Sequence, residues 1–155
     1  PAGRFPELLT SLCDNVRNPA APEMTKTSSL EAIGYMCEQL DSSDVEPGSV
    51  NKMLTAIIAG MEATMSNPIR RAATEALKNT VDLACDNFES EGERGMIMAS
   101  IKASATMCDD EKVREEAYDC LVVVKDFHLF SVDSIRDTVE CTTRPLIYTL
   151  SWVGV

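Results

Sequence analysis

Two stretches of the sequence repeat one helical pattern of apolar residues 44 positions apart. Residues 67–83 open with Asn67 and Pro68, a pair that favours a helix start, and continue with apolar residues at helical spacing. Residues 110–124 show the same order of residue types. The matched positions are Ile69, Arg70, Ala73 and Leu77, then Val113, Arg114, Ala117 and Leu121, with a fainter copy at Ser29 and Ile33. A helix with such an apolar stripe needs neighbours to bury it, so this period constrains the fold strongly.

The helices expected before these stretches repeat in step with them. Their matched positions are Leu8, Met53 and Ile97, and Leu12, Ile57 and Ile101, each set spaced by 45 and then 44 residues. A period of about 40–47 residues built from paired helices is typical of HEAT and armadillo repeats. The sequence therefore predicts an all-α fold, an α-solenoid of about three HEAT repeats made of antiparallel helix pairs.

Apolar spacing and turn residues give the expected boundaries. Helices are predicted at residues 5–16, 23–40, 49–64, 67–83, 89–106 and 110–125. They group into repeats at about 4–41, 47–86 and 89–125 within one array over residues 1–126. In the first helix we expect Leu8, Leu9, Leu12 and Val16 on the buried side.

The repeat pattern fails in the last part of the chain, residues 127–155. This stretch mixes β-prone residues with a short helical candidate, and Pro145 ends any helix there. We expect an atypical tail that is partly disordered or forms a loose cap on the last repeat. The opening residues PAGRFPELL are typical of a segment within a larger protein, and they form no signal peptide.

Composition narrows the classes of partner and site. The chain has 25 acidic against 14 basic residues, which disfavours nucleic acid and favours basic partners, although acidity can also serve solubility alone. No apolar run is long enough to insert into a membrane. The six cysteines form no C-x-x-C pair and His128 is the single histidine, so we expect reduced thiols, no metal and no cofactor.

The sequence shows no convergent catalytic group and no phosphate-binding glycine motif, so we predict that the protein is not an enzyme. Its function should then lie in a surface. The helix at 49–64 is apolar around more than one stripe, and the next outer helix can place Met96 and Ile97 beside Leu54 and Ile58. This arrangement predicts a shallow apolar groove for an extended peptide, and simple packing between repeats is the alternative interpretation.

Several runs of this sequence resemble the importin-beta (karyopherin-beta) family of nuclear transport receptors. The resemblance covers about residues 4–125 and does not extend to the tail. The runs that carry it are FPELL at 5–9, SLEAIGYMC at 29–37, LTAIIAGM at 54–61, AATEAL at 72–77, Asn87-Phe88 and Glu93-Arg94. They match the N-terminal third of such a receptor.

This resemblance implies nuclear protein import, with the protein present in cytoplasm and nucleus and at the nuclear pore. Implied partners are Phe-Gly nucleoporins and, for the full-length protein, the small GTPase Ran in its GTP form and an importin alpha adaptor or basic cargo. The implied Phe-Gly site falls on Leu54, Thr55, Ile58, Glu93, Met96 and Ile97. Met96 stands where relatives often carry an aromatic residue, so the shape of the pocket can differ.

Two alternatives remain at this point. A HEAT-repeat scaffold for protein complex assembly would share the fold but lack the groove and any transport activity. A helical enzyme would need a buried cluster of carboxylates or histidine, which the sequence does not show. A solenoid cut from a longer array exposes apolar ends, so we also predict self-association, which light scattering would detect.

Overall fold

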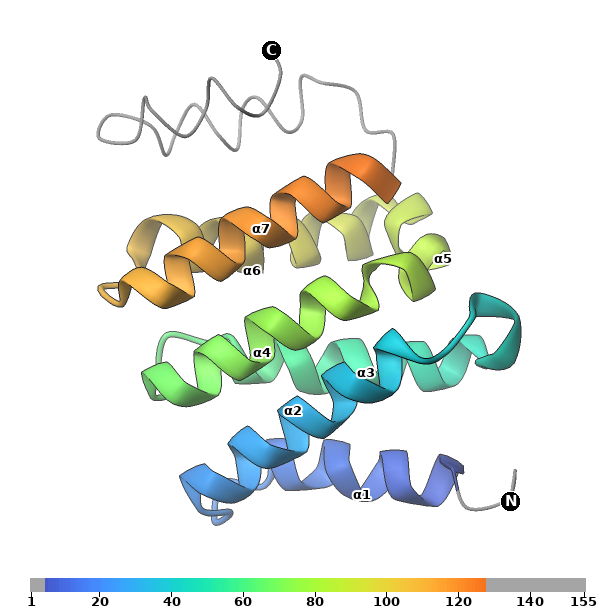
Figure 1. Cartoon of the computed structure of the whole chain (residues 1–155), viewed down its shortest axis with the longest axis horizontal. Coiled ribbons are helices and arrows are strands. Elements are labelled where there is room, and N and C mark those ends of the chain that lie inside the picture. The colour runs from blue at the N-terminus through green and yellow to red at the C-terminus, as the bar shows by residue number, and fades with distance from the viewer. Residues whose placement is uncertain (1–4, 128–155) are drawn as a thin grey trace.

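The computed structural model describes residues 5–127, and these form two layers of helices. Apart from residue 127, the predicted tail at 127–155 lies outside the described residues, and so do His128 and Cys141. Helices α1 (Phe5–Arg17), α3 (Pro47–Gly60) and α6 (Glu91–Met107) lie in the rear layer of Figure 1. Helices α2 (Glu23–Glu38), α4 (Asn67–Thr80) and α7 (Glu111–Phe127) lie side by side in front of them.

Each rear helix is joined by a short turn to the front helix that follows it and runs back in the opposite direction. The pairs α1–α2, α3–α4 and α6–α7 pack directly against each other. Three antiparallel pairs stacked in one direction confirm the predicted all-α solenoid. Two longer connections hold the remaining described elements, which are η1 (Ser42–Asp44), η2 (Val81–Ala84) and the short α5 (Cys85–Glu89).

The front layer is the more tightly packed of the two. Its alanine-rich helix α4 lies between α2 and α7, and Ala73 and Ala76 are buried at the α2 side. Small residues let the backbones approach, as at Gly60, where an added Cβ would lie 2.9 Å from the Ala73 Cβ and 3.0 Å from a Leu30 methyl. Three helices therefore meet at Gly60.

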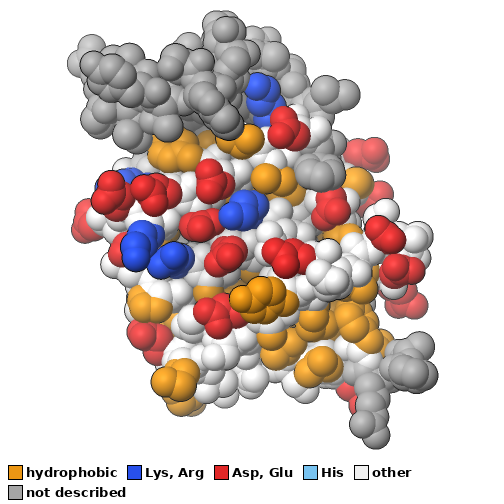
Figure 2. All heavy atoms as spheres, viewed as in Figure 1, with side chains coloured by type: hydrophobic (Ala, Val, Ile, Leu, Met, Phe, Trp, Pro, Cys, Tyr) orange, Lys and Arg blue, Asp and Glu red, His pale blue; other side chains and the backbone are white. Residues whose placement is uncertain are grey.

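Polar contacts join neighbouring repeats in this layer. The Lys78 ammonium pairs with the Glu116 carboxylate at 2.9 Å, which links α4 to α7. The Asn79 amide donates to Glu38 at 3.1 Å, which links α4 to α2. Figure 2 shows the face made by α2, α4 and α7, with acidic side chains scattered across it and fewer basic ones among them.

The turn between α6 and α7 is closed by hydrogen bonds to α7. The Asp110 carboxylate accepts from the Val113 amide at 3.0 Å and caps α7. The Arg114 guanidinium donates to the carbonyls of Cys108 and Asp109 at 2.7 and 2.9 Å. Asp110 therefore has a structural role at the start of this helix.

Several local predictions were wrong. Leu8 is 53% exposed, because the buried face of α1 is formed by Leu9, Cys13 and Val16. Asn67 is the first residue of α4 and does not cap it, because Ser66 occupies the cap position. The expected long helix at 67–83 ends at Thr80, and a 3-10 turn follows it.

Two other helix limits also differ from the prediction. Helix α3 starts at Pro47 and ends at Gly60, so Pro47 and Gly48 belong to its first turn rather than to a loop. Asn87, which lies between the helices predicted at 67–83 and 89–106, is part of α5, and α6 starts only at Glu91. Among the helices within residues 5–127, none is long and apolar enough to cross a membrane.

Candidate functional site: an apolar pocket between α3 and α6

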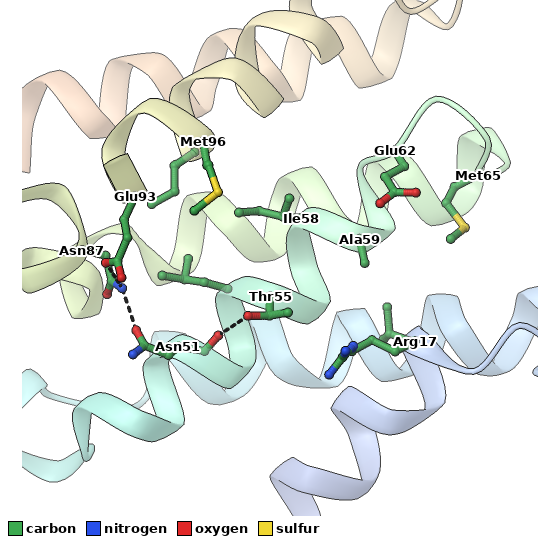
Figure 3. A pocket seen from close by; sticks show the side chains of 13 residues that line it. Arg17, Asn51, Thr55, Ile58, Ala59, Glu62, Met65, Asn87, Glu93 and Met96 are labelled. Carbon is green, nitrogen blue, oxygen red and sulfur yellow. Dashed lines mark hydrogen bonds between the residues drawn. The ribbon is translucent and has the colours of Figure 1, made fainter. Parts of the chain in front are cut away.

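An open pocket of about 640 Å³ lies between the rear helices α3 and α6. All six residues expected to form a Phe-Gly site line it, three from each helix. Figure 3 shows Thr55 and Ile58 on one side of the pocket and Glu93 and Met96 on the other. The full lining is Val16, Arg17, Asn51, Leu54, Thr55, Ile58, Ala59, Glu62, Met65, Asn87, Glu93, Met96 and Ile97.

The apolar lining residues differ in depth. Leu54 is only 5% exposed and Ile97 only 2% exposed, so these two side chains form the floor. Ile58 is half-buried, and Met96 is 61% exposed at the rim. A buried floor with an exposed, flexible rim can accept a planar apolar side chain without displacing the core.

Helical spacing explains why these residues share one surface. Asn51, Leu54, Thr55 and Ile58 recur at intervals of three and four residues along α3. The Thr55 hydroxyl donates to the Asn51 carbonyl at 2.7 Å, so it is turned back onto its own helix. Met53 and Ile57 on the same helix are fully buried and face the core, as the sequence predicted.

The pocket exists because α3 and α6 are spaced more widely than the other rear helices. Helix α1 packs closely against α3, whereas the main neighbours of α6 are α5 and α7. The connection from α4 to α6 is long and contains η2 and α5, with Phe88 buried in the core. This inserted α5 packs against α6, and its Asn87 lines one end of the pocket.

A hydrogen-bond network closes one end of the pocket. The Asn87 side-chain amide donates to the Asn51 side-chain carbonyl at 2.6 Å and to the Glu93 carboxylate at 2.8 Å. The network joins α3, α5 and α6, and Figure 3 shows Asn87 between the other two side chains. Sequence reasoning did not give Asn51 or Asn87 this role, although Asn87 lies in one of the runs that resemble importin-beta proteins.

Helix α1 also contributes to the site, which the sequence reasoning missed. Val16 and Arg17 reach the pocket from the preceding repeat, and Arg17 points toward α3 in Figure 3. Arg17, Asn51 and Thr55 also line a smaller neighbouring pocket of about 230 Å³ between α1 and α3. No repeat spacing in the sequence indicates which residue at a helix end reaches across to the next repeat.

The chemistry of the described residues does not suggest catalysis. Burial raises the pKa of the Cys13 thiol to about 11 and that of Cys120 to about 12. Such thiols stay protonated near neutral pH and are poor nucleophiles. Within residues 5–127, no group of three or more His, Cys, Asp or Glu side chains could hold a metal ion.

The chain is similar to curated proteins and to solved structures. No family model matches the chain. It is 38% identical to importin subunit beta-1 of Arabidopsis thaliana over 125 residues, which are 80% of this chain and 14% of the plant protein. The chain thus spans about one seventh of the length of this curated relative.

Two solved structures show the same arrangement of helices. A Kap95:Nup1 complex matches 96% of this chain and 16% of its own, with a TM-score of 0.74 and 31% sequence identity. A second structure concerns Kap95p binding that induces the switch loops of RanGDP to adopt the GTP-bound conformation. It matches 96% of this chain and 16% of its own, with a TM-score of 0.77 and 32% identity.

Proposed function

Because this chain belongs to the importin-beta family, we propose that it forms part of a nuclear transport receptor and binds Phe-Gly nucleoporin repeats between α3 and α6. One observation carries the proposal. The six residues that the family resemblance implies as a Phe-Gly site line one open apolar pocket.

The size of the interaction fits a transport role. A phenylalanine ring that buries about 100 Å² gains roughly 2–3 kcal/mol at about 25 cal/mol/Å², before the cost of ordering the peptide. A single pocket of this kind would bind in the millimolar range, since 1 mM corresponds to about 4 kcal/mol. Many weak sites acting together would give both retention and rapid exchange.

The wider partners follow from the relatives. One similar structure is a Kap95:Nup1 complex and another concerns Kap95p binding to RanGDP, so for the full-length protein we propose binding to nucleoporins and to Ran. That Ran binds in its GTP form is proposed on the family resemblance. Binding of an importin alpha adaptor or basic cargo is proposed on the same family basis. We propose on the same basis that the protein is present in cytoplasm and nucleus and at the nuclear pore, and that it is not an enzyme. We also propose that residues 1–126 form one HEAT-repeat array, with repeats at about 4–41, 47–86 and 89–125.

The proposal is tested by titrating isotope-labelled protein with a short Phe-Gly peptide and following amide shifts by NMR. We expect shifts clustered on α3 and α6 that disappear in Ile58→Asp. Leu8→Asp is the matched control, because it places the same charge on an exposed leucine of α1 outside the pocket. Thr55→Lys is a second pocket variant at an exposed position, where folding is not at risk.

Each result decides between the two functions. Shifts on α3 and α6 that survive in Leu8→Asp but not in Ile58→Asp and Thr55→Lys would support nucleoporin binding at this pocket. If the well-folded wild-type protein shows no shifts, the Phe-Gly site is refuted here. The HEAT-repeat scaffold for complex assembly would then be the better assignment.

A further inference from the structure

We propose that Asn87 is a positioning residue that sets the width of the pocket between α3 and α6, and through this width its affinity for a phenylalanine side chain. The inference rests on the proposed function, and it assigns a role to a residue outside the six expected to touch the peptide. It concerns how the pocket is held open at a defined spacing.

The position of Asn87 supports this role. It lies on α5, the short helix between the pair α3–α4 and the pair α6–α7, and is only 7% exposed. Both protons of its side-chain amide are used, one toward Asn51 on α3 and one toward Glu93 on α6. One buried side chain therefore bridges the two helices that form the walls.

Other contacts at this end hold α5 in place. Phe88 is buried in the core beside Asn87. The Arg94 guanidinium donates to the Phe88 carbonyl at 2.9 Å, which ties α5 to α6. In the described part of the chain, the side-chain link from α5 to α3 runs through Asn87 and Asn51. Helices α3 and α6 are also packed against α4 and α7, so loss of this link removes one of the contacts that fix their spacing.

The sensitivity of the pocket to this spacing follows from its shape. Dispersion contacts weaken steeply when a gap of even 0.5–1 Å opens, with about a quarter to a half of the attraction lost. The floor residues Leu54 and Ile97 lie on α3 and α6, so a phenylalanine ring contacts both side chains only at one separation of these two helices. A wider pocket would bind the ring on one wall at a time.

The test variant is Asn87→Asp, which keeps the shape of the side chain but removes both donors. The new carboxylate would face the Glu93 carboxylate and repel it. Adding Glu93→Gln restores a donor on α6, and the Asn51 amide can turn to donate from α3. The double variant thus rebuilds the bridge with reversed polarity. Glu93→Gln alone is measured to complete the double-mutant cycle.

The matched control is Asn79→Asp in the front layer. Asn79 also donates to a glutamate of a neighbouring helix, Glu38 on α2, but it lies away from the pocket. Asn79→Asp therefore places a new carboxylate next to a glutamate, as Asn87→Asp does. Asn51→Ala is a second test variant, because Asn51 is exposed and its loss breaks only the α3 side of the bridge.

The spacing of α3 and α6 is measured by electron–electron double resonance, which gives the distance between two nitroxide labels, one on each of these helices. Gly48→Cys on α3 and Gly95→Cys on α6 are suitable positions, because an added Cβ at either glycine meets nothing within 4 Å. Cys85 and Cys141 are replaced by serine to avoid unwanted labelling. We expect a longer mean distance or a broader distribution in Asn87→Asp, and a return to the wild-type distance in the double variant with Glu93→Gln.

Affinity for the Phe-Gly peptide should follow the distance. We expect the dissociation constant to rise on the order of threefold to tenfold in Asn87→Asp, with partial recovery in the double variant and no change in Asn79→Asp. An unchanged label distance in both Asn87→Asp and Asn51→Ala would overturn the inference. Absence of peptide binding by the wild-type protein would instead refute the proposed function, while the distances would still decide whether Asn87 sets the spacing.

Discussion

Replacement of Gly60 by alanine tests the close packing that seats α3 on the front layer. Gly60 ends α3, and its added Cβ would lie 2.9 Å from the Ala73 Cβ and 3.0 Å from a Leu30 methyl. The Ala73 Cβ is attached directly to the α4 backbone, so it can move only if α4 moves. Leu30 is fully buried, so its methyl groups are packed by neighbouring side chains.

The expected magnitude comes from two opposing effects. Overpacking by one methyl group in a tight core costs about 1–3 kcal/mol. Alanine in place of glycine in a helix returns about 0.5–1 kcal/mol through backbone entropy. Gly95→Ala is the matched variant, because Gly95 lies inside α6 with open space around its added Cβ. The difference in unfolding free energy between the two variants should therefore approximate the overpacking cost, about 1–3 kcal/mol.

Urea denaturation followed by circular dichroism measures both variants against the wild-type protein. Gly95→Ala should raise the midpoint and Gly60→Ala should lower it or leave it nearly unchanged. The slope of the transition should stay the same, so that midpoints report stability. If Gly60→Ala proves as stable as Gly95→Ala, the reasoning about contact between α3, α2 and α4 is refuted.

Three further predictions follow. A double-mutant cycle on Lys78→Ala and Glu116→Ala should give a coupling of about 0.5–1 kcal/mol in unfolding free energy, measured by urea denaturation, because the ion pair is only partly exposed. Additive effects of the two substitutions would contradict this prediction. Met96→Ala should weaken Phe-Gly peptide binding about threefold by NMR titration without loss of stability, since Met96 is a 61% exposed rim residue; unchanged affinity would exclude it from the site. Burial raises the pKa of the thiols of Cys13 and Cys120 above the usual 9.0, and the unfolded chain releases these protons first. The stability that the two protonated thiols contribute should therefore be intact below about pH 9 and should be lost as the pH rises toward about 11. The urea midpoint should fall less over this range in the double alanine variant. A wild-type midpoint that stays flat would refute the prediction.

The repeat period was sufficient to predict the fold. Residues such as Ile57 and Ile101, or Ala73 and Ala117, recur at matching positions and are all fully buried. In a solenoid each repeat packs mainly on its neighbours, so local periodicity carries nearly all of the tertiary information. Helix ends were predicted less well, because Pro47 and Asn67 suit more than one position near a helix start.

The apolar half of the candidate site was also predicted from the sequence, and the polar half was not. Leu54, Ile58 and Met96 follow from helical spacing together with the family resemblance. Asn51 and Asn87 are 36 residues apart, and no pattern connects them. Their contact depends on how η2 and α5 fold over the end of α4, which local spacing does not encode.

Sequence periodicity alone thus specified the helix pairs, their stacking order and the surface that carries apolar side chains, because these depend on contacts that recur at a regular interval. The tertiary structure decided the spacing of α3 and α6, the approach of Arg17 from the preceding repeat and the bridge through Asn87. These features arise where the regular interval is broken by an inserted element. A pocket open to solvent forms at such a break because the ordinary contacts between neighbouring repeats do not fill it.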